Sequence, residues 1–261
     1  MLNDQAIGAY LERLAHAAPV IADQAGLRAL HKAHLLAVPF ENLSIHLSEP
    51  ISLDEDDLIN KLVTRHRGGF CYELNGAFAL LLEALGAHVR RVGAKVYSQD
   101  GLGPPFDHLA LVVTAADGTG PWLVDVGFGA HSVYPLRLDD SAEQPDPGGV
   151  FKIVENETGD VEVTKDGQPQ YLFEQRERTL ADFIPTCWWQ QTAPQSHFRT
   201  GTICSRLTPD GRISISGRTL IRTGEGGRAE ESLPTDSAVL AAYREHFGIS
   251  LAQVPEVSPL Q

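Results

Sequence analysis

The sequence predicts a mixed α+β protein in which a helical N-terminal region is followed by an antiparallel β region and a mixed C-terminal lid. In the first third of the chain, apolar residues recur three and four positions apart, which is typical of one helical face. Beyond it, short apolar runs are separated by turn dipeptides such as Asp166-Gly167 and Asp210-Gly211. We therefore expect three parts, at residues 1–87, 88–200 and 201–261.

The composition is that of a folded acidic protein. The chain has 261 residues, 43% of them hydrophobic, and a formal net charge of −13. This charge argues against binding to nucleic acid or to an anionic membrane surface. Nothing in the sequence resembles a secretory signal or an apolar run that could span a bilayer, and the spacing of the three cysteines does not suggest zinc, so we expect none of these features. We expect a cytoplasmic protein, a monomer or weak homodimer, with no bound metal or cofactor.

Four helices are expected in the N-terminal region. Apolar spacing places the first two near residues 7–14 and 25–36, and Ser52-Leu53-Asp54-Glu55 predicts a capping box that opens the third. His31 and His34 lie three positions apart in the second helix, a spacing that could suit a metal. Because no acidic or sulfur ligand accompanies them, we interpret them as ordinary helix positions.

The rest of the chain is expected to be mainly strands. The loops are placed at 139–149 and at 224–231, the latter expected to be mobile, and a last helix is expected from Asp236, ending at Gly248. The expected strands share an apolar or β-branched core; they are 88–97, 109–113, 122–126, 150–154, 161–165, 171–173, 202–207, 213–215 and 219–222.

The stretch at residues 67–75, RGGFCYELN, carries the strongest chemical signal. Apolar residues at 74, 78, 81, 82 and 85 predict one helical face, so Cys71 opens a helix that ends at Gly86. At a helix N-terminus the macrodipole and the free N–H groups favour a thiolate, which is the nucleophilic form of cysteine. Taken alone, the same residue could be a buried structural thiol.

Two polar residues of the β region suit a nucleophilic cysteine. His108 begins an apolar strand, and Asp125 lies between Val124 and Val126, where a carboxylate is costly unless it is paired. Adjacent antiparallel strands would place Asp125 beside His108 and fix its tautomer. If His108 also meets Cys71, the three form a Cys–His–Asp triad with a thiolate–imidazolium pair. Separately, each residue also fits an ordinary structural role.

With these motifs, the sequence resembles the arylamine N-acetyltransferase family. Residues 39–43, PFENL, resemble its N-terminal signature, and residues 67–75 resemble its nucleophile motif. His108 with its strand, residues 125–129 (DVGFG), and the later Pro194, Ser196 and Phe198 resemble further family segments. The resemblance extends from about residue 37 to residue 198, most of the chain.

The resemblance implies a fold with a cysteine-protease-like core, made of an N-terminal helical bundle, a central antiparallel β-barrel and a C-terminal α/β lid. It implies a ping-pong reaction of xenobiotic metabolism, in which acetyl-CoA acetylates Cys71 and an aromatic amine, hydrazine or N-hydroxyarylamine takes the acetyl group. Cys71 would be the nucleophile, His108 the base and acid, and Asp125 the orienting residue, with the Cys71 N–H as an oxyanion donor. The residues expected to bind substrates are Phe40, Gly127, Phe128, Gly129, Gln195, Ser196 and His197.

Some positions depart from the family pattern. Cys187 stands where the family usually has asparagine, and Gln195 and His197 replace smaller hydroxyl residues that contact CoA in some relatives. These changes leave the acyl-CoA contacts and the acyl chain preference open. For Arg67 we favour a structural ion pair with Glu41 or Glu73 over a role in binding.

Three other functions fit the same residues. An amide synthase that closes a macrolactam from a carrier-bound chain would share the fold and triad, but would not accept free acetyl-CoA. A thiol hydrolase would lose its thioester rapidly to water. A non-catalytic binding module would have an unreactive Cys71.

Overall fold

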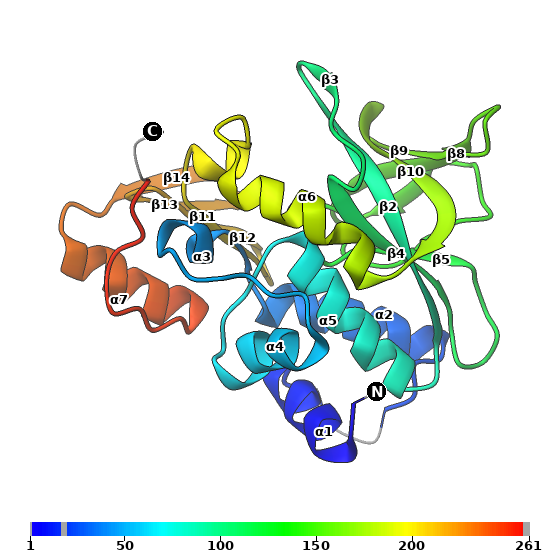
Figure 1. Ribbon diagram of the computed structural model, residues 1–261, viewed down its shortest axis with the longest axis horizontal. Coiled ribbons are helices and arrows are strands. Elements are labelled where there is room, and N and C mark those ends of the chain that lie inside the picture. Colours follow the sequence, from blue (N-terminus) through cyan, green and yellow to red (C-terminus); the bar gives the residue numbers. More distant parts are fainter. Residues whose placement is uncertain (1, 17–19, 258–261) are drawn as a thin grey trace.

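The computed structural model describes residues 2–16 and 20–257, and it places the three regions side by side (Figure 1). The helices of the first region lie below, the barrel lies at the right, and the C-terminal sheet with its helix lies at the left of the view. In the described ranges, every helix is too short or too polar to cross a bilayer. The structure has the predicted α+β class, although the boundaries at 87/88 and 200/201 stay predictions.

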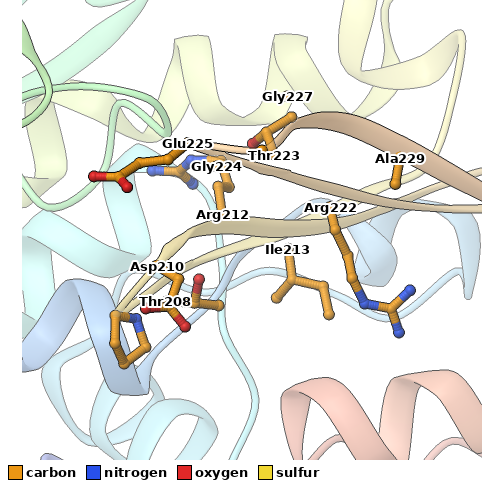
Figure 2. Close-up of a pocket in the computed structure, with 12 residues that line it drawn as sticks. Thr208, Asp210, Arg212, Ile213, Arg222, Thr223, Gly224, Glu225, Gly227 and Ala229 are labelled. Atoms are coloured by element: carbon orange, nitrogen blue, oxygen red, sulfur yellow. The ribbon is translucent and has the colours of Figure 1, made fainter.

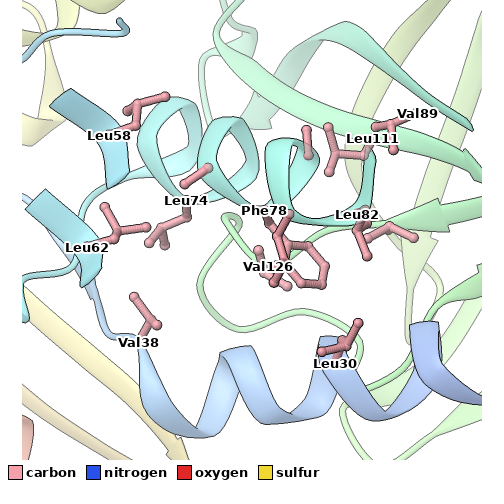
Figure 3. Packing of buried hydrophobic residues seen from close by; sticks show 14 of the residues in the cluster. Leu30, Val38, Leu58, Leu62, Leu74, Phe78, Leu82, Val89, Leu111 and Val126 are labelled. Carbon is pink, nitrogen blue, oxygen red and sulfur yellow. The ribbon is translucent and has the colours of Figure 1, made fainter. Parts of the chain in front are cut away.

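The N-terminal region is built around one buried helix. Twelve of the fourteen residues of α5 are buried, Glu73 and Asn75 among them, so the burial extends beyond the single apolar face predicted. Figure 3 shows Leu74, Phe78 and Leu82 of α5 packed between two layers: other helices on one side and Leu111 of the barrel on the other. The helices are α1 (Asp4–Arg13), α2 (Gln24–Ala37), α3 (Leu43–His46), α4 (Glu55–Ile59) continued by a π-helical turn (Asn60–Thr64), and α5 (Cys71–Ala84).

The capping box predicted at Ser52 is wrong. Asp54 occupies the N-cap of α4 and makes no side-chain cap bond, while the Ser52 hydroxyl accepts a hydrogen bond from the Asp54 N–H at 3.1 Å. A serine hydroxyl that accepts from the N–H two residues later closes a local turn, and such turns compete with helix capping for the same side chain. The helix starts where predicted, but with different chemistry.

The central region is an antiparallel barrel with strand order β6-β5-β4-β2-β10-β9-β8-β7. Its two end strands are bridged by a side chain: the Gln144 amide accepts from the Arg137 N–H at 2.7 Å and donates to the Arg137 carbonyl at 2.8 Å. The strands are β2 (His88–Ser98), β3 (Gly101–Leu102, paired with β2), β4 (His108–Thr114), β5 (Trp122–Val124), β6 (Leu136–Arg137), β7 (Gln144–Asp146), β8 (Gly149–Glu155), β9 (Val161–Lys165) and β10 (Gln168–Arg178).

A second sheet and the last helix form the C-terminal region. The strand order is β1-β11-β12-β13-β14, from β1 (Phe40–Glu41), β11 (Ile203–Thr208), β12 (Gly211–Ser216), β13 (Thr219–Gly224) and β14 (Gly227–Ser232). Helix α7 (Asp236–Phe247) buries Tyr243 and Phe247 in the same apolar cluster as Ile215. Because β1 comes from the first region, the sheet joins the first and last regions of the chain close to the start of α5.

Two expected loops in these regions are wrong. Residues 139–149 are not all loop, since they contain β7, and residues 224–231 contain most of β14, which pairs with β13, although their mobility stays a prediction. The sequence analysis also missed α6 (Leu180–Thr192), which contains Pro185. A proline inside a helix is unusual, because it removes one intrahelical hydrogen bond. The N-terminus of α6 is capped in the usual way, since Asp182 accepts a hydrogen bond from the Thr179 N–H at 2.7 Å.

Candidate active site

Cys71 is the first residue of α5, as predicted, and its side chain is almost completely buried. Two glycines make this position possible by letting backbones approach closely. A Cβ at Gly68 would lie 1.9 Å from the Pro39 carbonyl oxygen, and one at Gly69 would lie 2.6 Å from Glu73 Oε2. The RGG sequence therefore folds tightly against β1 before the helix begins, which fixes where the sulfur lies.

His108 and Asp125 meet at the same end of two neighbouring strands. His108 begins β4, and Asp125 follows the end of β5, which pairs antiparallel with β4 in the register Leu111 with Val124. His108 Nε2 lies 2.7 Å from Asp125 Oδ2, and both side chains are buried. Asp125 was predicted inside a strand; it lies just past the strand end, because the chain turns there into the loop that leads to β6.

Asp125 is held as a carboxylate. Its Oδ1 accepts from Asn75 Nδ2 at 2.9 Å and from the Gly127 N–H at 3.0 Å. Burial alone would raise the pKa of Asp125, but the charge and hydrogen bond of His108 and the bond from Asn75 outweigh it and hold the pKa well below its usual range. An ionised Asp125 accepts from Nε2–H, so Nδ1 is the ring nitrogen left to accept a proton.

The surroundings of the Cys71 sulfur act against the thiolate predicted at the helix N-terminus. Burial raises the pKa of the Cys71 thiol, and the nearby carboxylates of Asp107 and Asp125 raise it further, while the Leu109 backbone N–H acts in the opposite direction. Burial therefore opposes the ionisation that the helix N-terminus favours. The thiolate–imidazolium pair stays a prediction that requires transfer of the thiol proton to His108.

Cys71 and His108 both face a cavity of about 410 Å³. Four residues predicted to bind substrates also line it: Phe40, Gly127, Phe128 and His197. Further lining comes from Val96, Asp107, Phe198 and residues 200–203. The lining thus draws on all three regions of the chain, and its walls are mostly apolar and aromatic.

Three residues predicted to bind substrates do not line this cavity. Gln195 is exposed to solvent outside it. Ser196 is buried, and its hydroxyl donates to Gln190 Oε1 at 2.6 Å, so its polar group is used within the chain. Gly129 has a φ of +94°, which favours glycine, and its carbonyl accepts from Arg212 at 2.8 Å.

Comparisons with known proteins identify the family to which this site belongs. A family model described as N-acetyltransferase matches residues 23–256. The Mycobacterium tuberculosis arylamine N-acetyltransferase is 36% identical over 243 residues, which cover 90% of this chain and 86% of that protein. The chain belongs to the arylamine N-acetyltransferase family.

Other family members agree in sequence and in structure. The Salmonella typhimurium arylamine N-acetyltransferase / N-hydroxyarylamine O-acetyltransferase is 33% identical over 94% of this chain and 89% of its own length. The solved structure of the Mycolicibacterium relative, described as M. smegmatis arylamine N-acetyl transferase, superposes with a TM-score of 0.87 at 32% identity, covering 96% of this chain and 93% of that one. The Mycobacterium marinum enzyme in complex with CoA has a TM-score of 0.84 at 32% identity, covering 93% and 92%.

In this arylamine N-acetyltransferase family member, Arg67 has the structural role favoured from the sequence. Its guanidinium lies 2.9 Å from Glu41 Oε1 and 3.0 Å from Glu49 Oε2. Glu73 pairs instead with Lys61, at 2.5 Å. Arg67 and Glu41 are both almost fully buried, so the pair fixes β1 against the loop that leads to Cys71.

The sequence analysis missed functions for two residues that it had already named. Asn75 lies one helical turn after Cys71; it donates to Asp125 Oδ1 and to the Leu109 carbonyl, the latter at 2.6 Å, and accepts from the Val126 N–H at 2.9 Å. His31 accepts a hydrogen bond from the Asp125 N–H at 3.3 Å. For Asn75, the available signal was its i, i+4 spacing from Cys71, which places both residues on one helix face. For the contact of His31 with Asp125, the sequence contains no signal.

An aromatic cluster behind His108 also escaped prediction. The Tyr171 and Phe128 rings each lie 5.1 Å from the His108 ring, and His131 stacks on Tyr171 at 5.6 Å. Burial lowers the pKa of His131 to about 4, so this ring is neutral at pH 7. The cluster excludes water from the far side of the His108–Asp125 pair, which strengthens their interaction.

The departures from the family pattern lie at different distances from the chemistry. His197 lines the cavity, whereas Cys187 is buried in α6 and accepts from Gln191 Nε2 at 3.4 Å.

A separate open groove of about 710 Å³ lies over the β11–β12 and β13–β14 turns (Figure 2). It is lined by Thr208, Arg212 and Glu225 among others and includes neither Cys71 nor His108.

Proposed function

We propose that this chain transfers an acetyl group from acetyl-CoA to an aromatic amine, hydrazine or N-hydroxyarylamine by a ping-pong mechanism through a thioester on Cys71. The observation that carries the proposal is that Cys71 and His108 line one cavity, and that His108 is bonded on its buried side to Asp125. Family membership supports the reaction type, and the CoA complex of the Mycobacterium marinum relative supports the acyl donor.

In the first half-reaction, His108 Nδ1 takes the proton of the Cys71 thiol as the sulfur attacks the acetyl carbonyl carbon. The Cys71 N–H belongs to the first turn of α5, where such groups lack intrahelical partners, so it is a candidate donor to the developing oxyanion. The bond between the acetyl carbon and the CoA sulfur then breaks, and His108 returns its proton to the CoA thiolate. The products are acetyl-Cys71 and free CoA.

In the second half-reaction, the amine nitrogen attacks the thioester carbon and His108 accepts its proton. The bond from carbon to Cys71 sulfur breaks, and the proton returns to the sulfur. Asp125 keeps Nε2 protonated throughout, so the same ring nitrogen serves both halves. The Phe40, Phe128 and Phe198 rings at the cavity supply flat apolar contacts of the kind that an aromatic acceptor needs.

The test is intact-mass analysis of the protein mixed with acetyl-CoA without an acceptor, by rapid quench. We expect one added acetyl group on a peptide that contains Cys71, which disappears when an arylamine is added and acetylated amine forms. Cys71→Ser should give no adduct, and Cys187→Ser, which changes a buried cysteine outside the cavity, should behave as the parent protein. An adduct cleared by water alone would favour a hydrolase, and no adduct with acetyl-CoA would favour an amide synthase.

A further inference from the structure

One loop carries most of the chemistry that neighbours Cys71. Residues 125–133 leave the end of β5 and include Asp125, Gly127 and Phe128, the last two lining the cavity. These residues have no regular secondary structure, so hydrogen bonds from other elements must fix them. Two of those bonds come from one side chain of α2, far away in the sequence.

We infer that His31 is a positioning residue for acetyl transfer: its imidazole ties the Asp125 backbone at one end of this loop to the Val133 backbone at the other. His31 Nδ1 lies 2.9 Å from the Val133 carbonyl oxygen, and His31 Nε2 lies 3.3 Å from the Asp125 N. The inference rests on the proposed function, because the loop matters for catalysis only if Asp125 and Phe128 serve the reaction.

The two partners determine the state of the ring. A carbonyl oxygen can only accept, so Nδ1 carries the hydrogen, and a backbone N–H can only donate, so Nε2 must be unprotonated. Burial lowers the pKa of His31, although the Val133 carbonyl and the Asp125 and Asp146 carboxylates act in the opposite direction. The neutral ring is therefore the form that makes both contacts, and a protonated ring would leave the Asp125 N–H without this acceptor.

Each end of the loop also forms hydrogen bonds with a residue other than His31. Asn75 holds the side chain of Asp125 and the N–H of Val126, and Asp146 Oδ1 accepts from the Val133 N–H at 2.7 Å. His31 bonds to the backbone at both ends of the loop, so a single ring joins them. It thereby couples the orientation of Asp125 beside His108 to the placement of Phe128 at the cavity.

The same helix supplies a matched control. His34 lies one turn further along α2, is equally buried, and packs its ring against Phe78, as His31 does. Its Nε2 lies 3.1 Å from the Tyr10 hydroxyl, away from the loop. A change at His34 thus reproduces the loss of a buried ring from α2 without touching Asp125 or Val133.

The experiment uses His31→Asn, His31→Gln and His34→Asn in the full chain. An asparagine amide reaches about as far as Nδ1 and can keep the Val133 contact, whereas a glutamine oxygen reaches about as far as Nε2 and can keep the Asp125 contact. We expect His31→Asn to acetylate Cys71 about tenfold to a hundredfold more slowly per folded molecule, as small misplacements do in active sites. His31→Gln should stay within about threefold in this step but show a raised KM for the arylamine, since the Val133 end is released.

A second readout does not depend on the acyl donor. The pH profile of Cys71 alkylation by iodoacetamide, read by peptide mass spectrometry, reports on the coupled Cys71–His108–Asp125 unit. The titratable groups that face His31 are Asp125, Asp146, His131 and His34. We expect His31→Asn to shift this profile and His34→Asn to leave it unchanged.

The outcomes separate the two proposals. If His31→Asn matches His34→Asn in acetylation rate per folded molecule and in alkylation profile, the positioning role is refuted. If the parent protein forms no acetyl adduct while His31→Asn still shifts the alkylation profile, the proposed function fails and the role in acetyl transfer fails with it, whereas the positioning of the Cys71–His108–Asp125 unit by His31 stands. Should His31→Asn not fold, His31→Gln decides: a loss confined to the arylamine step supports the inference, and equal loss in both half-reactions overturns it.

Discussion

Gly127 lies directly against Cys71: a Cβ added to Gly127 would lie 2.8 Å from the Cys71 Cα and 2.8 Å from Asn75 Nδ2. The first turn of α5 and the loop after Asp125 are therefore in backbone contact. This contact explains a glycine at position 127 without reference to a ligand. It also means that there is no room for a side chain between Cys71 and the loop that begins at Asp125.

Gly127→Ala is accordingly expected to damage both stability and catalysis. Overpacking of this kind costs about 1–3 kcal/mol, because neither the Cys71 backbone nor the hydrogen-bonded Asn75 amide can give way freely. We expect a lower urea midpoint and a Cys71 acetylation rate reduced about tenfold to a hundredfold. Gly226→Ala is the control, since a Cβ there would meet nothing within 4 Å; equal behaviour of the two variants would contradict the contact.

Asp125→Asn should abolish most of the activity without unfolding the protein. An asparagine NH₂ can donate to His108 Nε2, which would place the ring hydrogen on Nδ1, where the proton of Cys71 has to go. We expect acetylation to slow about a thousandfold to ten-thousandfold, by analogy with other triads that lose their carboxylate. Single-turnover acetylation and thermal unfolding measured together check this, with the exposed Asp139→Asn as control; near-normal turnover would remove Asp125 from the mechanism.

The stability of the fold should decrease as the pH falls below about 6.5. Burial lowers the pKa of His131 to about 4 and that of His34 to about 3, whereas an unfolded histidine titrates near 6.5. The unfolded state therefore binds more protons over this range, so stability is full above about pH 6.5 and is lost towards pH 4. For His131 the difference of about 2.5 pKa units corresponds to about 3 kcal/mol at the acid end.

Urea unfolding at pH 7.5, 6 and 5 measures this dependence. His131→Phe keeps an aromatic ring but removes the titrating group, so its stability should fall less with acidification than that of the parent protein. The exposed His88→Gln is the matched histidine control and should follow the parent curve. A His131→Phe curve as steep as the parent curve would contradict the assignment.

Removing Arg67 should destabilise the fold because it strands a buried carboxylate. Arg67 and Glu41 are almost fully excluded from solvent and lie 2.9 Å apart. Arg67→Met is expected to cost about 3–5 kcal/mol in the free energy of unfolding, measured by urea titration. In the double variant Arg67→Met/Glu41→Gln the stranded charge is gone, so much of that loss should be recovered; a purely additive double variant would argue against the pair.

The sequence by itself was enough for the local features that carry Cys71 and His108. Helical spacing after Cys71 and the apolar run after His108 predict α5 and β4, because each pattern must bury one face whatever lies opposite. An aspartate among valines predicts a buried partner for the same reason. The motif at residues 67–75 added the family and, with it, the reaction.

Only the tertiary structure decided which polar groups support that chemistry. Helix α6 has apolar residues at helical spacing (Leu180, Phe183, Ile184 and Cys187), but its internal Pro185 disfavours a helix, and β14, with every residue exposed, has no apolar pattern to follow. His31 contacts Asp125 across 94 positions of sequence, and Ser196 turns out to bond Gln190 inside the protein. Hydrogen-bond partners depend on where the packed elements bring two backbones together, and the pattern of a single segment carries no information about its distant neighbour.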